Sequence, residues 1–406
     1  MTGNRLGLST GAFWPHAGTA EAPALVARLG VRDVEVMLQS TEEYQPAFAG
    51  ELRQAFDVAG ASVRSVHVKQ ALHLVFSDVA AEVADGWDLF DRAIGASVTL
   101  GASLLVWHGP SLRHEADVPA LMARFPAAAA QLAERCVAAG VTLTVENVSY
   151  CALPTVRDAR RYAERLDASG DDQTGFTFDP FQAAEAGANP FLMLAAMGRR
   201  LRNVHLSDYR SASGTSGHAI RHLPPGKGEL PWPALLRAVA TGYDGPLMLE
   251  SPLGPDPEET FRRVAAFLDP LIAAAGGDVL ATGELPPGVR EGIALFNTGA
   301  YYEAHEAIEF EWHAERGSIR RLYQGILQIG IGVHHARNGN RSGAILKLTD
   351  GITKVSEFAP AVAGIDTARL VSDAAAYLSA VIEVDGNVDK MRAIVPPQIR
   401  VATRTA

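Results

Sequence analysis

Four side chains that could bind a metal ion stand at the ends of short apolar runs. Glu146 closes VTLTVE, Asp179 closes GFTFD, His205 closes LRNVH and Glu250 closes PLMLE, and turn-like sequence follows each run. Burying a charged group at a strand end without a partner costs on the order of several kcal/mol. Repetition of the pattern indicates polar groups that converge at one end of a barrel, where a divalent cation would relieve the repulsion between carboxylates.

The ligand types indicate which ion such a site would take. Carboxylates with one imidazole form a hard, oxygen-rich site, which suits Mn²⁺, Mg²⁺ or Co²⁺ better than structural zinc, for which thiolates would be expected. We therefore expect these four residues to bind one divalent metal ion, although any one of them alone would be interpreted as a surface ion-pair partner. His67 and His108 end two earlier runs, and each is either a satisfied core histidine or part of the site.

The elements that would position these residues alternate through the first two-thirds of the chain. Short β-branched runs are separated by longer amphipathic, alanine-rich segments, a pattern typical of βαβ units and a parallel sheet. Eight such units in about 250 residues fit a (β/α)8 TIM barrel, whose reaction site lies at the C-terminal ends of the strands. A doubly wound sheet is the alternative, but no GxGxxG motif follows the first strand. The predicted strands cover residues 5–9, 33–37, 63–68, 103–107, 141–146, 175–179, 201–206 and 246–250, with helices at 81–100, 117–139 and 154–166 among those between them.

The pattern then changes to helices without strands. The run AAAGGDVLATGELPPGV combines small residues with glycine and proline, and it predicts a linker at 275–287 between a barrel at 1–274 and an all-α domain at 288–406. Short connections between the helices indicate a small bundle or an array of helix hairpins. The predicted helices cover residues 288–298, 300–316, 318–337, 341–357 and 366–384.

A second dense motif, FNTGAYYEAHEAIEFEW, lies in the helical part. On a helix, His305 and Glu309 are one turn apart and share a face. The next helix carries His335, at helical spacing from two glutamines on an otherwise apolar segment, and such polar groups need partners when they are buried. We consider two interpretations: a second metal or small-ligand site built from His305, Glu309 and His335, or a buried hydrogen-bond network that fixes the helix packing.

The composition restricts the classes of function. The chain has 406 residues, too many for one compact core, and its formal net charge of -10 argues against a large phosphate-binding surface, so we do not expect nucleic acid as a partner. Only two cysteines occur, Cys136 and Cys151, in no metal or redox spacing. No apolar run is long enough for a membrane span, and the start MTGNRLGLSTGAFWPH lacks the apolar core of a signal peptide, so we expect a cytoplasmic protein.

The barrel region resembles the xylose-isomerase-like superfamily, which includes sugar-phosphate isomerases and epimerases and endonuclease IV. The matching motifs are VENVSY, FDPFQ, VHLSDY, HLPPGKGELPW and LMLESP. In the ketose epimerases of that superfamily the four equivalent residues bind one divalent metal. The resemblance implies that Glu146 and Glu250 are both metal ligands and the acid/base pair on opposite faces of the substrate, with Asp179 and His205 as further ligands.

The chain departs from that superfamily at two places. Many members have a histidine three residues after the strand-six aspartate, where this chain has Gln182, a far weaker ligand. The three-metal site of endonuclease IV is therefore in doubt. In addition, an insertion-like run, RSASGTSGHAIR, follows VHLSDY and contains His218, whose role we cannot assign. The C-terminal part resembles a bacterial family of unknown function, number 309, through its YYEAHE run and the following YQG, LQ and HHARN segments.

The first hypothesis is a divalent-metal-dependent isomerase or epimerase of a sugar, sugar phosphate or small hydroxyketone. In it, one carboxylate removes a carbon-bound proton to give an enediolate and another group returns it. The second is an endonuclease-IV-like phosphodiesterase at abasic DNA, and the third is a non-catalytic ligand-binding scaffold. Under all three hypotheses the sequence leaves open whether the chain forms a homo-oligomer. The residues expected to contact a polyol or sugar substrate are His67, His108, Gln182, Asp208, Arg221, His222 and Lys227.

Overall fold

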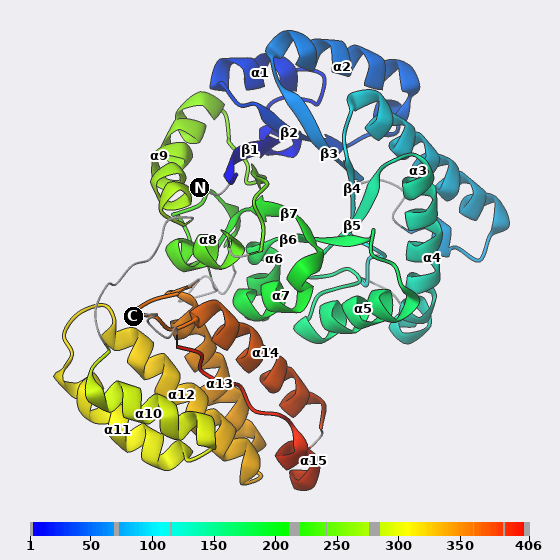
Figure 1. Cartoon of the computed structure of the whole chain (residues 1–406). Coiled ribbons are helices and arrows are strands. Elements are labelled where there is room, and N and C mark those ends of the chain that lie inside the picture. Colours follow the sequence, from blue (N-terminus) through cyan, green and yellow to red (C-terminus); the bar gives the residue numbers. More distant parts are fainter. Residues whose placement is uncertain are drawn as a thin grey trace.

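The chain folds into a barrel followed by a helical domain (Figure 1). The computed structural model describes residues 3–68, 73–113, 116–210, 220–240, 242–275, 285–359, 361–384 and 386–401, and of Ile220 and Arg221 the backbone only. In the described residues no helix is long and apolar enough to cross a membrane.

Eight parallel strands of the described chain close into a barrel in the order β1-β10-β7-β6-β5-β4-β3-β2. Leu8 of β1 pairs with Leu249 of the last strand on one side and with Val34 of the second strand on the other, which closes the sheet. The predicted (β/α)8 fold is therefore confirmed. The strands are β1 Arg5–Ser9, β2 Asp33–Leu38, β3 Ser62–Val68, β4 Leu104–Trp107, β5 Thr142–Glu146, β6 Gly175–Phe178, β7 Leu201–Leu206 and β10 Pro246–Leu249.

Side chains alternate along each barrel strand between the helices and the lumen. Val34, Leu105 and Val145 belong to one apolar cluster that also holds Leu52 and Phe90 of the surrounding helices, so these strand residues face outward. The residues between them face the lumen, which is largely polar near its C-terminal mouth. The surrounding helices are α1 Ala22–Leu29, α2 Pro46–Ala59, α3 Ala80–Leu100, α4 Val118–Ala138, α5 Val156–Ser169, α6 Pro180–Glu185, α7 Pro190–Met197, α8 Trp232–Ala240 and α9 Pro257–Ala275.

A short antiparallel hairpin that we did not predict follows β7, and it consists of β8 (Asp208–Arg210) and β9 (Ile220–Leu223). The run between these two strands, which includes His218, lies outside the described residues. The same holds for most of the predicted linker, since α9 ends at Ala275, the next helix begins at Pro287, and residues 276–284 are not described.

The helical domain has its own apolar core. Two of its helices cross closely, because a Cβ placed on Gly351 would lie 2.7 Å from Gly325 O and 2.8 Å from Ile329 N. Glycine at this crossing lets the backbones approach without a side chain between them. The helices are α10 Pro287–Thr298, α11 Tyr301–Ala314, α12 Arg320–Arg337, α13 Arg341–Ser356, α14 Thr367–Glu383 and the short α15 Val388–Ala393, which we did not predict.

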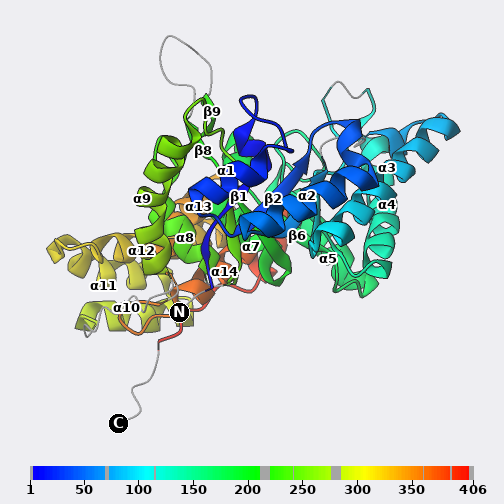
Figure 2. The ribbon, with the colours of Figure 1, turned by 90° about the horizontal axis from the view of Figure 1, so that it is seen from above.

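The helical domain packs against the side of the barrel formed by α7 and α8, through α13 and α14. Leu192 of α7 is part of the apolar core of the helical domain, and Asn189 Nδ2 donates a 2.8 Å hydrogen bond to Thr353 Oγ1. In Figure 2 the β8–β9 hairpin stands at the top of the molecule and the helical domain lies below it. The described contacts between the two domains are therefore on the side wall of the barrel.

Candidate metal centre at the barrel mouth

The four strand-end residues come together at the C-terminal mouth of the barrel. Glu146 ends β5, Asp179 directly follows β6, His205 lies in β7 and Glu250 directly follows β10. One ligand atom from each lies within 4.8 Å of those of the other three. His205 Nδ1 lies 3.1 Å from Glu250 Oε2 and 3.3 Å from Glu146 Oε1, at the centre of the group.

Local structure holds Asp179 in place. Its side chain caps α6, with Oδ1 accepting a hydrogen bond from Phe181 N at 2.7 Å. Its backbone is fixed by Asn147, whose Oδ1 accepts from Asp179 N at 2.8 Å and whose Nδ2 donates to Asp179 O at 2.9 Å. Within the described part of the chain, Asp179 Oδ2 is buried and has no hydrogen-bond partner. A buried acceptor without a donor is costly, so this oxygen is a candidate ligand for a metal ion.

The pKa values of the carboxylates in this site also favour a bound cation. Burial raises the pKa of Asp179 well above its usual range, and the negative charges of Glu146 and Glu250 raise it further. Burial also acts to raise the pKa of Glu146, but the positive charges of His205 and His108 outweigh it and hold that pKa well below its usual range. Three carboxylates are thus close together, and few positive charges of the protein are near enough to compensate their negative charges. A divalent ion would relieve the repulsion between them.

His67 and His108 also face this site. The two Nε2 atoms are 2.6 Å apart, and Glu146 Oε2 lies 3.1 Å from His108 Nε2 and 3.5 Å from His67 Nε2. His67 is fully buried, whereas His108 is partly exposed at the mouth. These three residues form a second group that could hold a metal ion, and it shares Glu146 with the first.

Glu35 of β2 is a site residue that we did not predict. It is fully buried, and with His67 and His205 it forms a third such group. Burial acts to raise the pKa of Glu35, but the positive charge of His205 and hydrogen bonds from both histidines outweigh it, so that pKa lies below its usual range. The strand DVEVML contained the signal, because an acid between Val34 and Val36 must face the lumen if those two residues face the helices.

Comparison with known proteins agrees with this architecture. The model of the xylose isomerase-like TIM barrel family matches residues 23–271, and that of a domain of unknown function (DUF309) matches residues 289–346. The chain belongs to the xylose isomerase-like TIM barrel family. Both resemblances seen in the sequence are thereby confirmed. No curated protein sequence matches the chain.

Solved structures share the fold of this xylose isomerase-like barrel at low sequence identity. A D-psicose 3-epimerase in the presence of D-fructose has 18% identity and a TM-score of 0.54, covering 68% of this chain and 100% of that one. An L-ribulose 3-epimerase has 20% identity and a TM-score of 0.55, covering 67% and 95%. A xylose isomerase-like TIM barrel protein from Mycobacterium smegmatis in complex with magnesium has 16% identity and a TM-score of 0.51, covering 67% and 97%.

Two of the residues expected to bind substrate instead hold loops of the xylose isomerase-like barrel. Gln182 Oε1 accepts a 3.0 Å hydrogen bond from Ser149 N. The buried carboxylate of Asp208 accepts five hydrogen bonds of 2.8–3.2 Å, four from backbone N–H groups and one from Trp232 Nε1. Both Asp208 oxygens accept hydrogen bonds within the protein, and contact of this residue with a substrate stays a prediction.

The remaining residues expected at the loop have mixed placements. His222 lies in β9 with φ 49°, and its ring lies 4.2 Å from that of Phe181, measured between centroids. Lys227 is exposed, and its backbone carbonyl accepts a hydrogen bond from Arg210. The side chain of Arg221 lies outside the described residues. Contact of these three residues with a substrate stays a prediction.

The second site predicted in the helical domain is not formed. His305 Nδ1 lies 3.7 Å from Glu309 Oε2, while His335 Nδ1 has Asn340 Nδ2 at 3.4 Å. Among the described residues, every group of three or more side chains able to hold a metal lies in the barrel. The alternative, a buried hydrogen-bond network, stays a prediction, although the His305 and Glu309 side chains are 27% and 42% exposed. His305 and Glu309 are close because they share a helix face, whereas His335 lies on the next helix and does not join them.

Proposed function

We propose that this xylose isomerase-like barrel is a divalent-metal-dependent isomerase or epimerase of a sugar, sugar phosphate or small hydroxyketone. The observation that carries the proposal is the convergence of Glu146, Asp179, His205 and Glu250 on one point, with the unpartnered Asp179 Oδ2 among them. Membership of the family and the sugar epimerases among the proteins of similar fold support the choice of reaction.

The residues fit a divalent ion with oxygen-rich coordination. Three carboxylates and one imidazole suit Mg²⁺ or Mn²⁺, and neither cysteine belongs to any of the groups of described residues that could hold a metal ion. When bound, such an ion acidifies the carbon-bound proton of a hydroxyketone and stabilises the enediolate. The magnesium complex among the proteins of similar fold is consistent with this choice.

The protein's own groups then hold and move the proton. Glu146 and Glu250 flank His205 Nδ1, at 3.3 Å and 3.1 Å, and the second oxygen of Glu146 lies 3.1 Å from His108 Nε2 at the mouth. One carboxylate takes the proton from the substrate carbon, and the other returns a proton on the opposite face or at the neighbouring carbon. Burial of the site excludes water, which would otherwise compete for the enediolate.

Deuterium exchange tests the assignment of the two glutamates. The protein is incubated in D2O with Mg²⁺ and D-fructose, and then with other ketoses and hydroxyketones, and label at carbon is read by NMR. The wild type is expected to label one substrate, whereas Glu146→Gln and Glu250→Gln each lose at least about 100-fold in rate, as expected for removal of a general acid or base. Glu258→Gln, which removes an exposed ion-pair partner of Arg28, serves as the matched control and should keep the rate. Full exchange in both site variants would contradict the assignment.

A second candidate function has one specific observation in its favour. His67, His108 and Glu146 could hold a second cation beside the first and share Glu146 as a bridge, an arrangement typical of two-metal hydrolysis of phosphodiesters. An endonuclease acting at abasic DNA would use such a pair. Gln182, already bonded to Ser149 N, and the net charge of -10 count against it. Cleavage of an abasic duplex with Zn²⁺ or Mn²⁺, lost in His108→Ala, would favour this candidate over the isomerase. If an ion binds but neither reaction occurs, the ligand-binding scaffold is favoured.

A further inference from the structure

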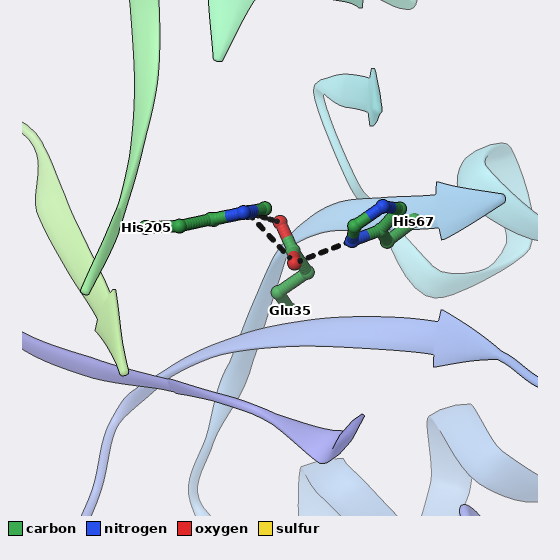
Figure 3. Close-up of side chains that lie close together, drawn as sticks. All are labelled: Glu35, His67 and His205. Atoms are coloured by element: carbon green, nitrogen blue, oxygen red, sulfur yellow. Dashed lines mark hydrogen bonds and ion pairs between the residues drawn. The ribbon is translucent and has the colours of Figure 1, made fainter. Parts of the chain in front are cut away.

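Glu35 lies between His67 and His205 in the lumen of the barrel (Figure 3). Its Oε1 is 3.0 Å from His205 Nε2 and 3.2 Å from His67 Nδ1, and its Oε2 is 3.1 Å from His205 Nε2. The proposed mechanism does not use this carboxylate. It is nevertheless fully buried, so its charge must be compensated by the groups that it contacts.

Two neutral donors complete the surroundings of Glu35. Ser65 Oγ donates a 2.7 Å hydrogen bond to Oε2, and Asn203 Nδ2 donates one of 3.0 Å to the same oxygen. Asn203 Nδ2 also lies 3.2 Å from His205 Nε2, so the amide N–H group and the ring lie side by side at the same carboxylate oxygen. A metal ion held by Glu35 and the two rings would face that amide. The group is therefore better described as a hydrogen-bonded acceptor than as a further metal site.

These contacts decide which nitrogen of each ring carries the proton. A metal-bound or neutral imidazole has one N–H, and the hydrogen bond made by that nitrogen fixes the tautomer. A carboxylate only accepts, so the ring nitrogens that face Glu35 must be the donors. His205 Nδ1 also faces carboxylates, at 3.1 Å from Glu250 Oε2 and 3.3 Å from Glu146 Oε1, so its tautomer follows from the proposed function: if Nδ1 binds the metal ion, the donor to Glu35 is Nε2. For His67 the donor is Nδ1, which leaves the Nε2 lone pair facing His108 Nε2, 2.6 Å away.

We propose that Glu35 is a positioning residue that holds His205 as its Nε2–H tautomer and His67 as its Nδ1–H tautomer. The inference for His205 rests on the proposed function, because there the ring of His205 supplies a lone pair to the metal ion. The inference for His67 does not rest on the proposed function. Glu35 contacts neither the ion nor the substrate, and it acts by orienting both rings. Loss of such an outer partner weakens metal binding by roughly 10-fold to 100-fold.

The test is Glu35→Gln, which keeps the shape of the side chain but offers one acceptor oxygen and one NH2 group. That NH2 group would face a donor N–H, so at least one ring is expected to change its tautomer. Histidine tautomers are read by long-range ¹H–¹⁵N NMR on ¹⁵N-labelled protein saturated with Mg²⁺, and the Kd for Mg²⁺ is read by calorimetry. We expect the stated tautomers in the wild type, a changed tautomer in Glu35→Gln and a Kd raised by about 10-fold to 100-fold. Asp33→Asn, also a carboxylate-to-amide change, at the first residue of β2, where Asp33 forms an ion pair with Arg5, should alter neither reading.

Unchanged tautomers together with a Kd within twofold of the wild type in Glu35→Gln would overturn the proposal. If that variant does not fold, the wild type alone decides, because a His67 protonated on Nε2 contradicts the role given to Glu35. If Mg²⁺ does not bind the wild type, the proposed function fails, but the tautomer of His67, read without the ion, still tests Glu35. The two failures are therefore distinguishable.

Discussion

Asp179 has two structural roles that substitution can separate. Oδ1 caps α6 through Phe181 N at 2.7 Å and, more weakly, Gln182 N at 3.4 Å. Oδ2 is buried without a hydrogen-bond partner in the described part of the chain, and we propose that it binds the metal ion. Asparagine keeps the cap, because it is as good an N-cap as aspartate, but it removes the negative ligand. Alanine removes both.

The expected magnitudes differ between the two roles. A lost N-cap costs about 1 kcal/mol, within a range of about 0.5–2 kcal/mol. An ion present at 100 times its Kd stabilises the folded state by about 2.7 kcal/mol, and a 100-fold weaker Kd reduces that gain to about 0.4 kcal/mol. In a chelator, Asp179→Asn should be no less stable than the wild type, because it relieves repulsion with Glu146 and Glu250. Asp179→Ala should be about 1 kcal/mol less stable than Asp179→Asn.

The assay is urea unfolding in EDTA and again in Mg²⁺ at 100 times the Kd of the wild type. Four of the five tryptophans lie in the barrel and only Trp312 lies in the helical domain, so fluorescence reports mainly the barrel, whereas circular dichroism reports both domains. Only the wild type should gain about 2.7 kcal/mol from the ion. Equal gains in the wild type and Asp179→Asn would refute the role of Oδ2, and a loss of about 1 kcal/mol in Asp179→Asn in the chelator would refute the separation from the cap.

Three further predictions concern the scaffold. Asp208→Asn replaces an acceptor-only group by one that also donates, so backbone N–H groups of the loop lose their partner, and hydrogen exchange at residues 224–230 should accelerate by at least about 10-fold. Asn189→Ala removes the cap of α7 and the bond to Thr353, and it should lower stability by about 1–2 kcal/mol in urea unfolding; no loss would show that this contact is dispensable. Gly351→Ala would place a Cβ 2.7 Å from Gly325 O and force α12 and α13 apart, so unfolding of the helical domain should be easier by about 1–3 kcal/mol; unchanged stability would contradict the close crossing.

Much of the barrel follows from the sequence because its strands are short, apolar and separated by clear helical segments. The predicted 201–206 matches β7 at both ends, and the last predicted strand, 246–250, differs from β10 by one residue. Within the site, Glu146, Asp179, His205 and Glu250 could be found from the sequence, because each is a charged or polar residue that ends an apolar run. We call this pattern the strand-end rule. The rule works since the C-terminal ends of parallel strands meet at one mouth.

The rule fails for residues that lie deeper in the lumen or that serve loops. Glu35 is in the middle of its strand, and only the alternation of residues that face the lumen with residues that face the helices reveals it. Asp208 lies near the mouth, as expected, but the direction of its carboxylate depends on the path of the loop up to Trp232, which no local pattern encodes. For His335, helical periodicity gives the face of its own helix and not the register between helices, so the distance to His305 could not be predicted.

Anomalous diffraction from a crystal soaked in Mn²⁺ tests the central claim most directly, because it gives the position of the ion and its ligands together. We predict a strong peak within about 2.0–2.4 Å of oxygens from Glu146, Asp179 and Glu250 and of His205 Nδ1. A further peak at His67 and His108 would favour the two-metal candidate without removing the first site. A saturating soak with no peak among the four residues would contradict the account.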